Sequence, residues 1–225
     1  YFRDNQNLIV NLFIPSVLSW REKGVQVWQQ TNYPEEETVR FTFACREPVK
    51  LPLHIRCPGW AESGISARLN GEELSVKSQA GQYAVIDREW KNGDRLEIAI
   101  PMELRLESMP DNPRRTAVVY GPVVLAADLG SPDGNKNGED RLAPVWITGN
   151  RPVSEWMERC AGQPLAFCTL QVGRPADTTL IPFYRMHHRR YGVYWDLFTE
   201  EEWKQRETAY LNERKRLREM EERTI

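Results

Sequence analysis

The stretch LPLHIRCPGWAESGISARLNG, residues 51–71, places a histidine and a cysteine within three positions of each other. An apolar side chain recurs at every second position, at Leu51, Leu53, Ile55 and Cys57, which is the period-two pattern of a β-strand. Because successive side chains on a strand point to opposite faces, Cys57 shares the apolar face and His54 lies on the other. The two side chains therefore point apart, and the stretch predicts a strand with a buried cysteine rather than a cysteine–histidine site.

The same stretch ends in a turn signal, and similar strand patterns surround it. Asn70-Gly71 separates ISARL from EELSV, and both residues tolerate the positive φ angles of a tight hairpin. Period-two patterning recurs between turn residues at positions 8–14, 25–31, 38–44, 65–69, 83–87, 95–100 and 103–106. Closely spaced strands without a long helix between them predict an antiparallel β-sandwich.

The bulk composition describes an ordinary folded chain. It has 225 residues, of which 40% are hydrophobic, and a net charge of -2, which does not indicate nucleic acid or an anionic membrane as partner. The longest apolar run, residues 117–127, is too short to cross a bilayer and is broken by Gly121-Pro122. The chain starts at Tyr1 within a strand pattern, without an initiator methionine, so we expect it to be part of a longer protein.

The amino-acid composition changes at Gly130. Residues 130–140, GSPDGNKNGED, are polar and rich in turn formers, which predicts a flexible linker. Further strand candidates follow this segment at 143–147, 165–171, 179–184 and 191–195, with a short helical turn at 154–159. They predict a second, smaller β-rich domain.

The last stretch has the features of a long helix. No glycine or proline occurs from residue 199 to residue 223, and Thr199 with Glu202 forms a capping-box signature. An apolar residue recurs every seven positions, at Trp203, Tyr210 and Leu217. We expect this narrow stripe to pack on the rest of the protein, because polar residues at the intervening positions disfavour a coiled coil.

The sequence thus predicts an all-β fold with two consecutive antiparallel β-sandwich units, jelly-roll-like, and a long C-terminal helix. The predicted parts are a β-sandwich domain at 1–128, a flexible linker or loop at 129–142, a second, smaller β-rich domain at 143–198 and a charged helix at 199–225.

The cysteines and histidines do not form a recognisable site. No pair among Cys45, Cys57, Cys160 and Cys168 has the C-x-x-C spacing of a zinc or redox motif, so each is interpreted as a small buried hydrophobe. His187 and His188 are adjacent, so on a strand they face opposite sides, and the arginines around them would repel a cation.

A calcium-loop order occurs within the predicted linker. Asp133, Asn135, Asn137 and Gly138 follow the D-x-N-x-N-G pattern, but Pro144 occupies the twelfth position, where a calcium loop needs a bidentate glutamate. A linker is therefore favoured over a calcium site.

The eight tryptophans are the remaining candidates for a site. Four lie in or beside strand patterns and are interpreted as packing residues: Trp28, Trp90, Trp146 and Trp195. Trp20 and Trp60 lie near turns, so we expect them to be more exposed and treat them as weak carbohydrate-contact candidates. No carboxylate pair and no nucleophile or phosphate-loop motif marks a catalytic centre.

A series of motifs follows in order along nearly the whole chain: LIVNLFIPSVLSW, QTNYP, VRFTF, LPLHIRCPGWA, LNGEEL, GQYAVIDREWKNGDRLEIAIPMELRLE and YGPVVLAADL. This order resembles glycoside hydrolase family 127 and its relative, family 146, whose members are typically β-L-arabinofuranosidases. The later run LIPFYRMHHRRYGVYW, with the charged helix, resembles the longer members of the Bacteroidota type.

The resemblance implies an (α/α)6 catalytic barrel before the sandwiches. In the family this barrel carries a zinc held by cysteines and a glutamate, a cysteine nucleophile and a glutamate acid/base, and a tandem Cys-Cys precedes the segment that matches the start of this chain. We therefore expect the barrel, and its zinc, upstream of Tyr1. None of the four cysteines lies in a matching context, so no catalytic, cofactor-binding or metal-binding residue is carried over to this chain.

The residues and the resemblance together predict a non-catalytic C-terminal β-sandwich portion of a glycoside hydrolase acting on arabinofuranosides. Its expected partners are its own N-terminal catalytic barrel and plant-type arabinan or arabinogalactan glycans, with a homo-oligomer as a further alternative and neither nucleic acid nor membrane. The resemblance favours a periplasmic or extracellular location. Two other functions stay open: an autonomous carbohydrate-binding module, and a hydrolase site of unfamiliar type within this chain.

Overall fold

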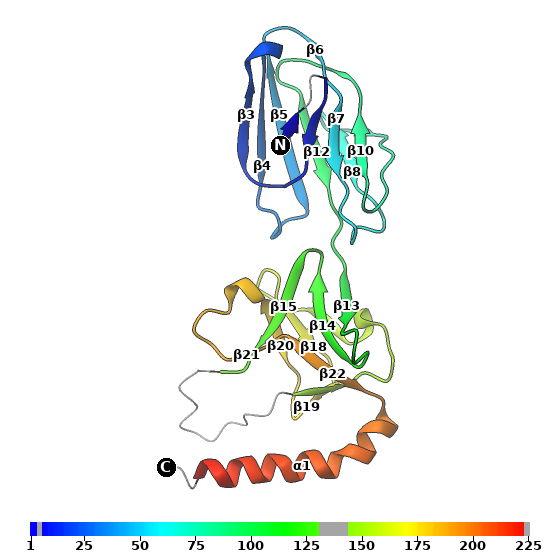
Figure 1. Cartoon of the computed structure of the whole chain (residues 1–225), viewed down its shortest axis with the longest axis vertical. Coiled ribbons are helices and arrows are strands. Elements are labelled where there is room, and N and C mark those ends of the chain that lie inside the picture. Colours follow the sequence, from blue (N-terminus) through cyan, green and yellow to red (C-terminus); the bar gives the residue numbers. More distant parts are fainter. Residues whose placement is uncertain (4–5, 131–143, 223–225) are drawn as a thin grey trace. The chain divides into compact units, whose positions relative to one another are not determined.

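The computed structural model describes residues 1–3, 6–130 and 144–222. These residues form two compact units, Tyr1–Glu103 (unit 1) and Leu104–Ile225 (unit 2). Strands are the predominant secondary structure of the described residues, and the one long helix among them lies at the C-terminal end (Figure 1). The predicted all-β class with a C-terminal helix is confirmed.

Unit 1 is built from short strands and one 3-10 turn. Their bounds are β1 (Phe2–Arg3), β2 (Leu8–Val10), β3 (Ser16–Trp20), η1 (Arg21–Lys23), β4 (Val25–Thr31), β5 (Thr38–Cys45), β6 (Val49–Lys50), β7 (Leu53–Arg56), β8 (Ser66–Leu69), β9 (Glu72–Leu74), β10 (Tyr83–Ile86), β11 (Glu89–Trp90) and β12 (Arg95–Ala99).

Two principal sheets make up unit 1. The larger has six antiparallel strands in the order β3-β4-β5-β12-β8-β9, and the smaller has four strands in the order β1-β2-β7-β10. A two-stranded ribbon joins β6 and β11. In the four-stranded sheet, β2 runs parallel to β7, so this sheet is mixed rather than wholly antiparallel as predicted.

The inward side chains of both sheets share one apolar core. Leu53 and Ile55 come from the smaller sheet, and Phe41 and Phe43 from the larger, and all four are fully buried. Trp90 stacks on Phe43 with ring centroids 3.9 Å apart, and its indole N–H donates to the carbonyl oxygen of Leu51 at 2.7 Å. This side-chain hydrogen bond satisfies the only polar atom of the indole inside the core.

The predicted Asn70-Gly71 hairpin is present between β8 and β9. Leu69 pairs with Glu72, and the two turn residues have φ angles of 51° and 91°. Asparagine and glycine adopt such angles with little strain, which explains why they occupy this turn.

Unit 2 contains ten strands, two 3-10 turns and the helix among the described residues. Their bounds are β13 (Leu104–Ser108), β14 (Arg115–Tyr120), β15 (Val123–Asp128), β16 (Val145–Ile147), η2 (Val153–Glu155), β17 (Met157–Arg159), β18 (Phe167–Thr169), β19 (Gly173–Arg174), β20 (Thr179–Pro182), η3 (Phe183–Arg185), β21 (Tyr191–Gly192), β22 (Tyr194–Phe198) and α1 (Glu200–Glu222).

The division between the units differs from the predicted boundary after residue 128. The strands β13, β14 and β15 form successive antiparallel pairs, and they belong to the sheet of unit 2. The reason is non-local pairing: β14 pairs with β22 and β15 with β20, which lie far along the chain. The predicted helical turn at 154–159 is also shorter, since it continues as strand β17 after η2.

Unit 2 buries a group of tryptophans. Trp146 stacks on Trp195 with ring centroids 4.5 Å apart, and Trp156 lies at 5.4 Å from Trp146 in a tilted arrangement. All three side chains are at most 1% exposed. Their role as packing residues is thereby confirmed for Trp146 and Trp195, as it is for Trp90 in unit 1.

Two of the four cysteines differ from the sequence prediction. Cys160 and Cys168 form a disulfide, whereas Cys45 and Cys57 are free and buried as predicted. The antiparallel pairing of β17 with β18 brings the two Cα atoms to 5.6 Å, within the range that a disulfide spans. A search for C-x-x-C spacing alone does not detect this cross-strand pair.

The predicted C-terminal helix is confirmed as α1. The Thr199 hydroxyl accepts from the Glu202 amide at 3.2 Å, and the Glu202 carboxylate accepts from the Thr199 amide at 2.9 Å, which is the capping box. Trp203 is 5% exposed and packs with Phe198 and Ile147, with Tyr210 partly buried beside it. The side chain of Leu217 lies outside the described part. In that part, no helix combines the length and apolarity needed to cross a membrane.

Candidate functional site

The opening histidine–cysteine pair is not a site. Cys57 is fully buried, and His54 lies on the opposite, half-buried face of β7, as predicted. Burial raises the pKa of the Cys57 thiol. Burial, together with the nearby Asp94 carboxylate, also raises the pKa of Cys45. Both thiols therefore stay protonated at neutral pH, which makes them poor nucleophiles and poor metal ligands.

The other metal candidates do not assemble either. His187 and His188 are exposed and follow the turn η3 rather than a strand. Across residues 1–3, 6–130 and 144–222, no cluster of three or more histidine, cysteine or acidic residues could hold a metal ion. The calcium-like residues Asp133, Asn135, Asn137 and Gly138 lie outside the described residues.

The tryptophan predictions are partly wrong. Trp20 ends strand β3 on the inward face opposite Val25 and is only 4% exposed, so its predicted exposure is contradicted. Trp60 is half-buried against the core of unit 1, and its proposed carbohydrate contact stays a prediction. Trp28 was interpreted as a packing residue, but it is more exposed than that interpretation implies. Its neighbours Val27 and Gln29 point inward, so the Trp28 side chain lies on the outer face of the sheet and is half-buried.

Two cross-strand rows form on the outer face of the six-stranded sheet. The strand register gives the polar row as Gln30, Arg40, Glu97, Arg68 and Glu73. The next row, called the tryptophan row, contains Val17, Trp28, Thr42 and Arg95.

These rows border a cavity of about 750 Å³. Its lining includes Gln30, Arg40, Arg68 and Glu97 from the polar row and Thr42 and Arg95 from the tryptophan row. Its volume is in the range of small-ligand sites. Its lining is mostly polar, because Phe41 and Leu96, the apolar residues of the lining, are fully buried, and Trp28 lies outside the lining. This outer face is therefore the candidate functional site.

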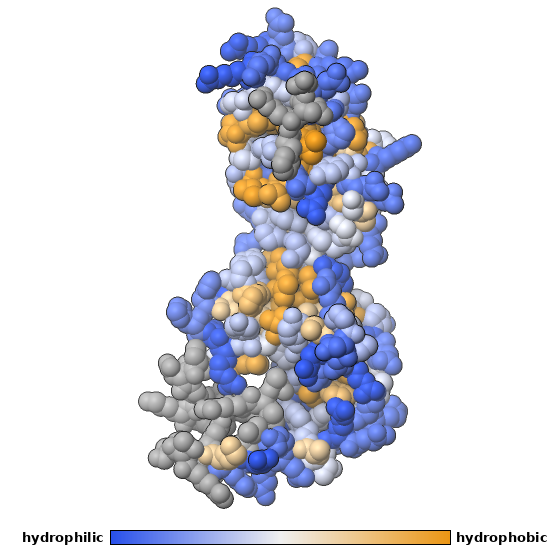
Figure 2. All heavy atoms as spheres, in the orientation of Figure 1, coloured by the Kyte–Doolittle hydropathy of each residue, from blue (hydrophilic) through white to orange (hydrophobic). Residues whose placement is uncertain are grey.

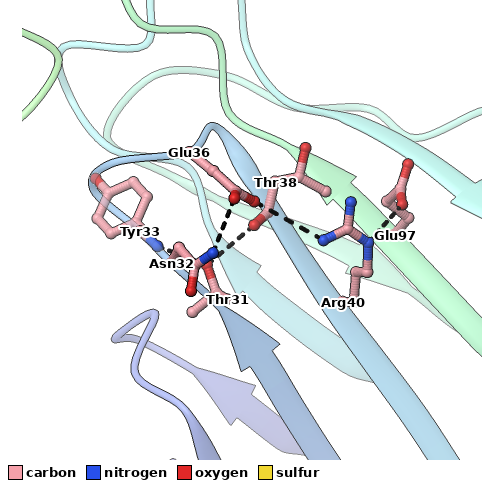
Figure 3. Close-up of polar contacts among 7 residues, drawn as sticks. All are labelled: Thr31, Asn32, Tyr33, Glu36, Thr38, Arg40 and Glu97. Atoms are coloured by element: carbon pink, nitrogen blue, oxygen red, sulfur yellow. Dashed lines mark hydrogen bonds and ion pairs between the residues drawn. The ribbon is translucent and has the colours of Figure 1, made fainter. Parts of the chain in front are cut away.

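A hydrogen-bond network positions Arg40 at this site (Figure 3). The Arg40 Nε atom donates to Glu97 Oε2 at 3.0 Å, and Arg40 Nη1 lies 4.0 Å from Glu36 Oε2. Glu36 in turn accepts from the Asn32 side-chain amide at 2.8 Å, in the loop between β4 and β5. Thr31 closes this loop. Its hydroxyl donates to the Thr38 carbonyl oxygen at 2.9 Å. The same hydroxyl oxygen accepts from the Tyr33 backbone amide at 2.9 Å. The guanidinium is thus held between two carboxylates, one from the β4–β5 loop and one from strand β12.

The edge of the site beside Arg95 is also fixed. The Asn70 side chain donates to Asp94 at 3.0 Å and accepts from the Arg95 amide at 2.8 Å. Burial of Asp94 acts to raise its pKa, but the hydrogen bonds from Asn70 and Lys91 and the charge of Arg88 outweigh this effect. The pKa of Asp94 therefore lies below its ordinary value. The carboxylate stays ionised at neutral pH and holds the hairpin that carries Asn70.

A second cavity, of about 710 Å³, lies in unit 2 and includes Asp177, Asp128 and Arg189 in its lining. Asp177 accepts three backbone N–H bonds, from residues 171–173, and a hydroxyl bond from Thr169. Desolvation acts to raise the Asp177 pKa, but these hydrogen bonds lower it below its ordinary value. Asp128 forms an ion pair with Arg189. Because the carboxylates of Asp177 and Asp128 already bind other groups of unit 2, this cavity is the weaker candidate for a functional site.

Unit 1 has a defined counterpart among protein families. Residues 7–102 match the family model described as the middle domain of glycoside hydrolase family 127, β-L-arabinofuranosidase. The matched segment coincides closely with Tyr1–Glu103, the range of unit 1. The candidate outer face therefore lies within the matched domain. The sequence predicts a C-terminal placement in a glycoside hydrolase, and the matched model is named a middle domain, so that placement stays a prediction.

Solved structures share the fold over most of the chain. A family 127 β-L-arabinofuranosidase from Geobacillus stearothermophilus T6 matches with a TM-score of 0.65 at 21% identity, over 88% of this chain and 34% of that one. A protein named glycoside hydrolase gives 0.60 at 22%, over 84% and 36%. A family 127 β-arabinofuranosidase gives 0.63 at 22%, over 86% and 35%. The chain thus spans about a third of the length of these structures, and no curated protein matches it.

Proposed function

We propose that the chain is the non-catalytic β-sandwich portion of a glycoside hydrolase that acts on arabinofuranosides. The observation that carries this proposal is the match of residues 7–102 to the middle-domain model of family 127. The shared fold with larger arabinofuranosidases supports it. The finer placement, in family 127 or family 146 and at the C-terminal side of the enzyme, is part of the proposal.

The chemistry is assigned to an (α/α)6 barrel outside this chain, which would hold the zinc ion. The residues of this chain do not fit a thiolate-bound zinc, because the thiols of Cys45 and Cys57 are buried with raised pKa values. Cys160 and Cys168 are joined to each other. No catalytic step is therefore derived for the chain.

Its proposed role is to support the barrel through an apolar patch on unit 1. Leu12, Ile14, Tyr83 and Val85 are 44–56% exposed, and we call them the apolar patch. Figure 2 shows apolar side chains among hydrophilic ones on the surface of unit 1. Side chains of this kind on the surface of a folded domain mark interaction sites when they gather.

The patch is held in place by polar contacts. The buried Gln29 side chain donates to the carbonyl oxygens of Leu12 and Ile14 at 3.0 and 2.8 Å. The Tyr83 hydroxyl donates to the Asn11 side chain at 2.8 Å and so ties β10 to the same segment. The outward orientation of Leu12 and Ile14 is therefore built into unit 1, as expected for a fixed docking surface.

The test uses the protein in which the chain is joined to its barrel. Replacing Leu12 and Ile14 by glutamate should lower the melting temperature of the joined protein, because the barrel contact would bury two charges. The same double variant of the chain alone should melt as the unchanged chain does. Val17→Glu, at a similarly exposed valine of the other sheet, is the matched control. An equal loss for the control, or no loss for the double variant, would contradict this docking role.

The proposed location is periplasmic or extracellular. The Cys160–Cys168 disulfide supports it, because disulfides persist in oxidising compartments. We also propose plant-type arabinan or arabinogalactan as the substrate of the whole enzyme, and assembly into a homo-oligomer.

A further inference from the structure

We propose that the outer face of the six-stranded sheet in unit 1 binds an internal segment of a neutral glycan. Trp28 is the stacking platform, and the polar row hydrogen-bonds the sugar hydroxyls. This inference goes beyond the supporting role proposed above and does not depend on it, because it is carried by the geometry of one sheet face.

Trp28 is the first observation. Its strand alternates strictly, with Val25, Val27, Gln29 and Thr31 buried, so the indole lies on the solvent side of a strand inside the sheet. The side chain is half-buried rather than covered, between Val17 on one strand and Thr42 on the next. An indole offers a flat apolar surface and one N–H donor, which suits the apolar face of a sugar ring and its hydroxyls.

The polar row supplies donors and acceptors in alternation. Arg40 and Arg68 flank Glu97, and Glu73 lies on the other side of Arg68. A sugar hydroxyl both donates and accepts, so it can bridge a guanidinium donor and a neighbouring carboxylate acceptor. Arg40 is already oriented by Glu97 at 3.0 Å, and this preorganisation lowers the entropy cost of binding.

The charges of the face favour a neutral ligand. The face carries three positive and three negative side chains, so its charges cancel. The arginines are Arg40, Arg68 and Arg95, and the glutamates, in the sheet or the adjoining loop, are Glu36, Glu73 and Glu97. A polyanion would need an excess of positive charge, and this face does not offer one. A glycan without carboxylate or sulfate groups therefore fits better than an acidic one.

The layout of the face favours an internal segment of a glycan over the end of a glycan. The polar row crosses five neighbouring strands, β4 to β9 in sheet order. With strands about 4.8 Å apart, the row spans roughly 19 Å, which is long enough for several consecutive sugar units. The cavity beside it has a volume of about 750 Å³. A single sugar would use only part of this surface.

The experiment measures binding of the full chain to soluble polysaccharides. Affinity electrophoresis and calorimetry would use neutral arabinan, xylan and mixed-linkage glucan, with polygalacturonate as the anionic comparison. We expect binding to at least one neutral polymer and no preference for polygalacturonate. Trp28→Ala should weaken that binding about tenfold or more, as expected for an aromatic anchor. Arg95→Gln and Glu97→Gln should each weaken it by about threefold or more.

Three controls keep the result interpretable. Trp28→Tyr retains a ring and should keep intermediate affinity, which separates loss of stacking from loss of folding. Arg56→Gln removes an exposed arginine from the four-stranded sheet and should bind as the unchanged chain does. Leu12→Glu with Ile14→Glu should leave glycan binding intact, so failure of the barrel contact and failure of this site can be told apart.

Four outcomes would overturn the proposal. They are no binding to any neutral polymer of the panel, binding to polygalacturonate alone, binding unchanged by Trp28→Ala and Glu97→Gln, and equal loss in Arg56→Gln. Binding to a neutral polymer that falls in the order Trp28→Tyr, then Trp28→Ala, with Arg56→Gln unaffected, would support it.

Discussion

The two units of this chain reach an all-β fold by different means. Unit 1 alternates strictly along its longer strands, and the inward side chains of two sheets fill one apolar core. The longest strands of unit 2 have six residues against eight in unit 1, and unit 2 relies on stacked tryptophans, a disulfide and a docked helix. Unit 1 is also the part that matches a known domain family, over residues 7–102. Both units depend on strand pairs that are distant in sequence, and they differ in how their interiors are filled: by alternating side chains of two sheets in unit 1 and by specific anchors in unit 2.

The core of unit 1 should be the most sensitive point of the chain. Trp90 is fully buried, stacks on Phe43 at 3.9 Å and bonds the Leu51 carbonyl. Trp90→Ala should therefore lower the free energy of unfolding by about 3–5 kcal/mol, through cavity formation and the lost indole contact. Chemical denaturation followed by tyrosine and tryptophan fluorescence measures it. A loss under 1 kcal/mol would contradict the picture of one shared core in unit 1.

The docking of the helix of unit 2 should depend mainly on one buried side chain. Trp203 lies 6.0 Å from the Phe198 ring and 5.1 Å from Tyr210, and few other buried side chains surround it. Trp203→Ala should cost about 3 kcal/mol, the lower end for a buried tryptophan, because the cluster is small. Circular dichroism should show partial loss of helix before the sheets melt. Tyr210→Phe keeps the ring beside Trp203 and removes only the hydroxyl bond to the Arg174 carbonyl, so its effect should be smaller. An unchanged helix signal in Trp203→Ala would mean that the helix needs no docking.

The disulfide sharpens the comparison, since only unit 2 has one. The bridge closes a short loop between residues separated by eight positions, so replacing both cysteines by serine should cost about 2 kcal/mol. Thiol titration of the denatured chain should find two free thiols before reduction and four after it. Cys45→Ser with Cys57→Ser tests the other pair and should be destabilising without any response to reductant. Four titratable thiols before reduction would show that the bridge does not form.

The smallest effect is expected at Asp94 and should depend on pH. Its folded pKa lies below the ordinary value of 3.8, so the carboxylate stabilises the fold at neutral pH. That contribution is complete above pH 3.8 and is lost as the pH falls through the lowered folded pKa. Asp94→Asn should therefore cost about 1 kcal/mol at pH 7, and the difference should shrink below pH 4. Urea denaturation at pH 7 and pH 3 measures it, and a gap that widens on acidification would contradict the assignment.

The sequence predicted unit 1 better than unit 2 for a physical reason. Strand β4 was predicted with the observed bounds, and the Asn70-Gly71 turn was predicted from the backbone preferences of its own residues. The pairing of β14 with β22 and of Cys160 with Cys168 depends on residues that local patterns do not connect. The boundary between the units was misplaced for the same reason, because residues 104–128 follow the strand pattern of unit 1 but pair within unit 2.

The candidate site was also only partly visible in the sequence. Proximity to a turn suggested exposure of Trp20, but its position in the register of β3 turns it inward. Trp28 was interpreted as a packing residue because it lies in a strand, although the alternation from residue 25 to residue 31 already places it outward. Counting the faces strand by strand would have found it. The rows that combine it with Arg40, Glu97 and Arg95 require the strand order, which no local signal supplies.

The central proposal is the non-catalytic role of this chain, and its most direct test is hydrolysis of an aryl β-L-arabinofuranoside by the purified chain, with and without added zinc. We predict no turnover above the uncatalysed rate in either condition, and turnover by a protein that joins the chain to its barrel. Turnover that survives replacement of all four cysteines by serine would reveal a carboxylate site and contradict the claim. Turnover lost on Cys57→Ser alone would contradict it as well, because it would make a buried, protonated thiol the nucleophile.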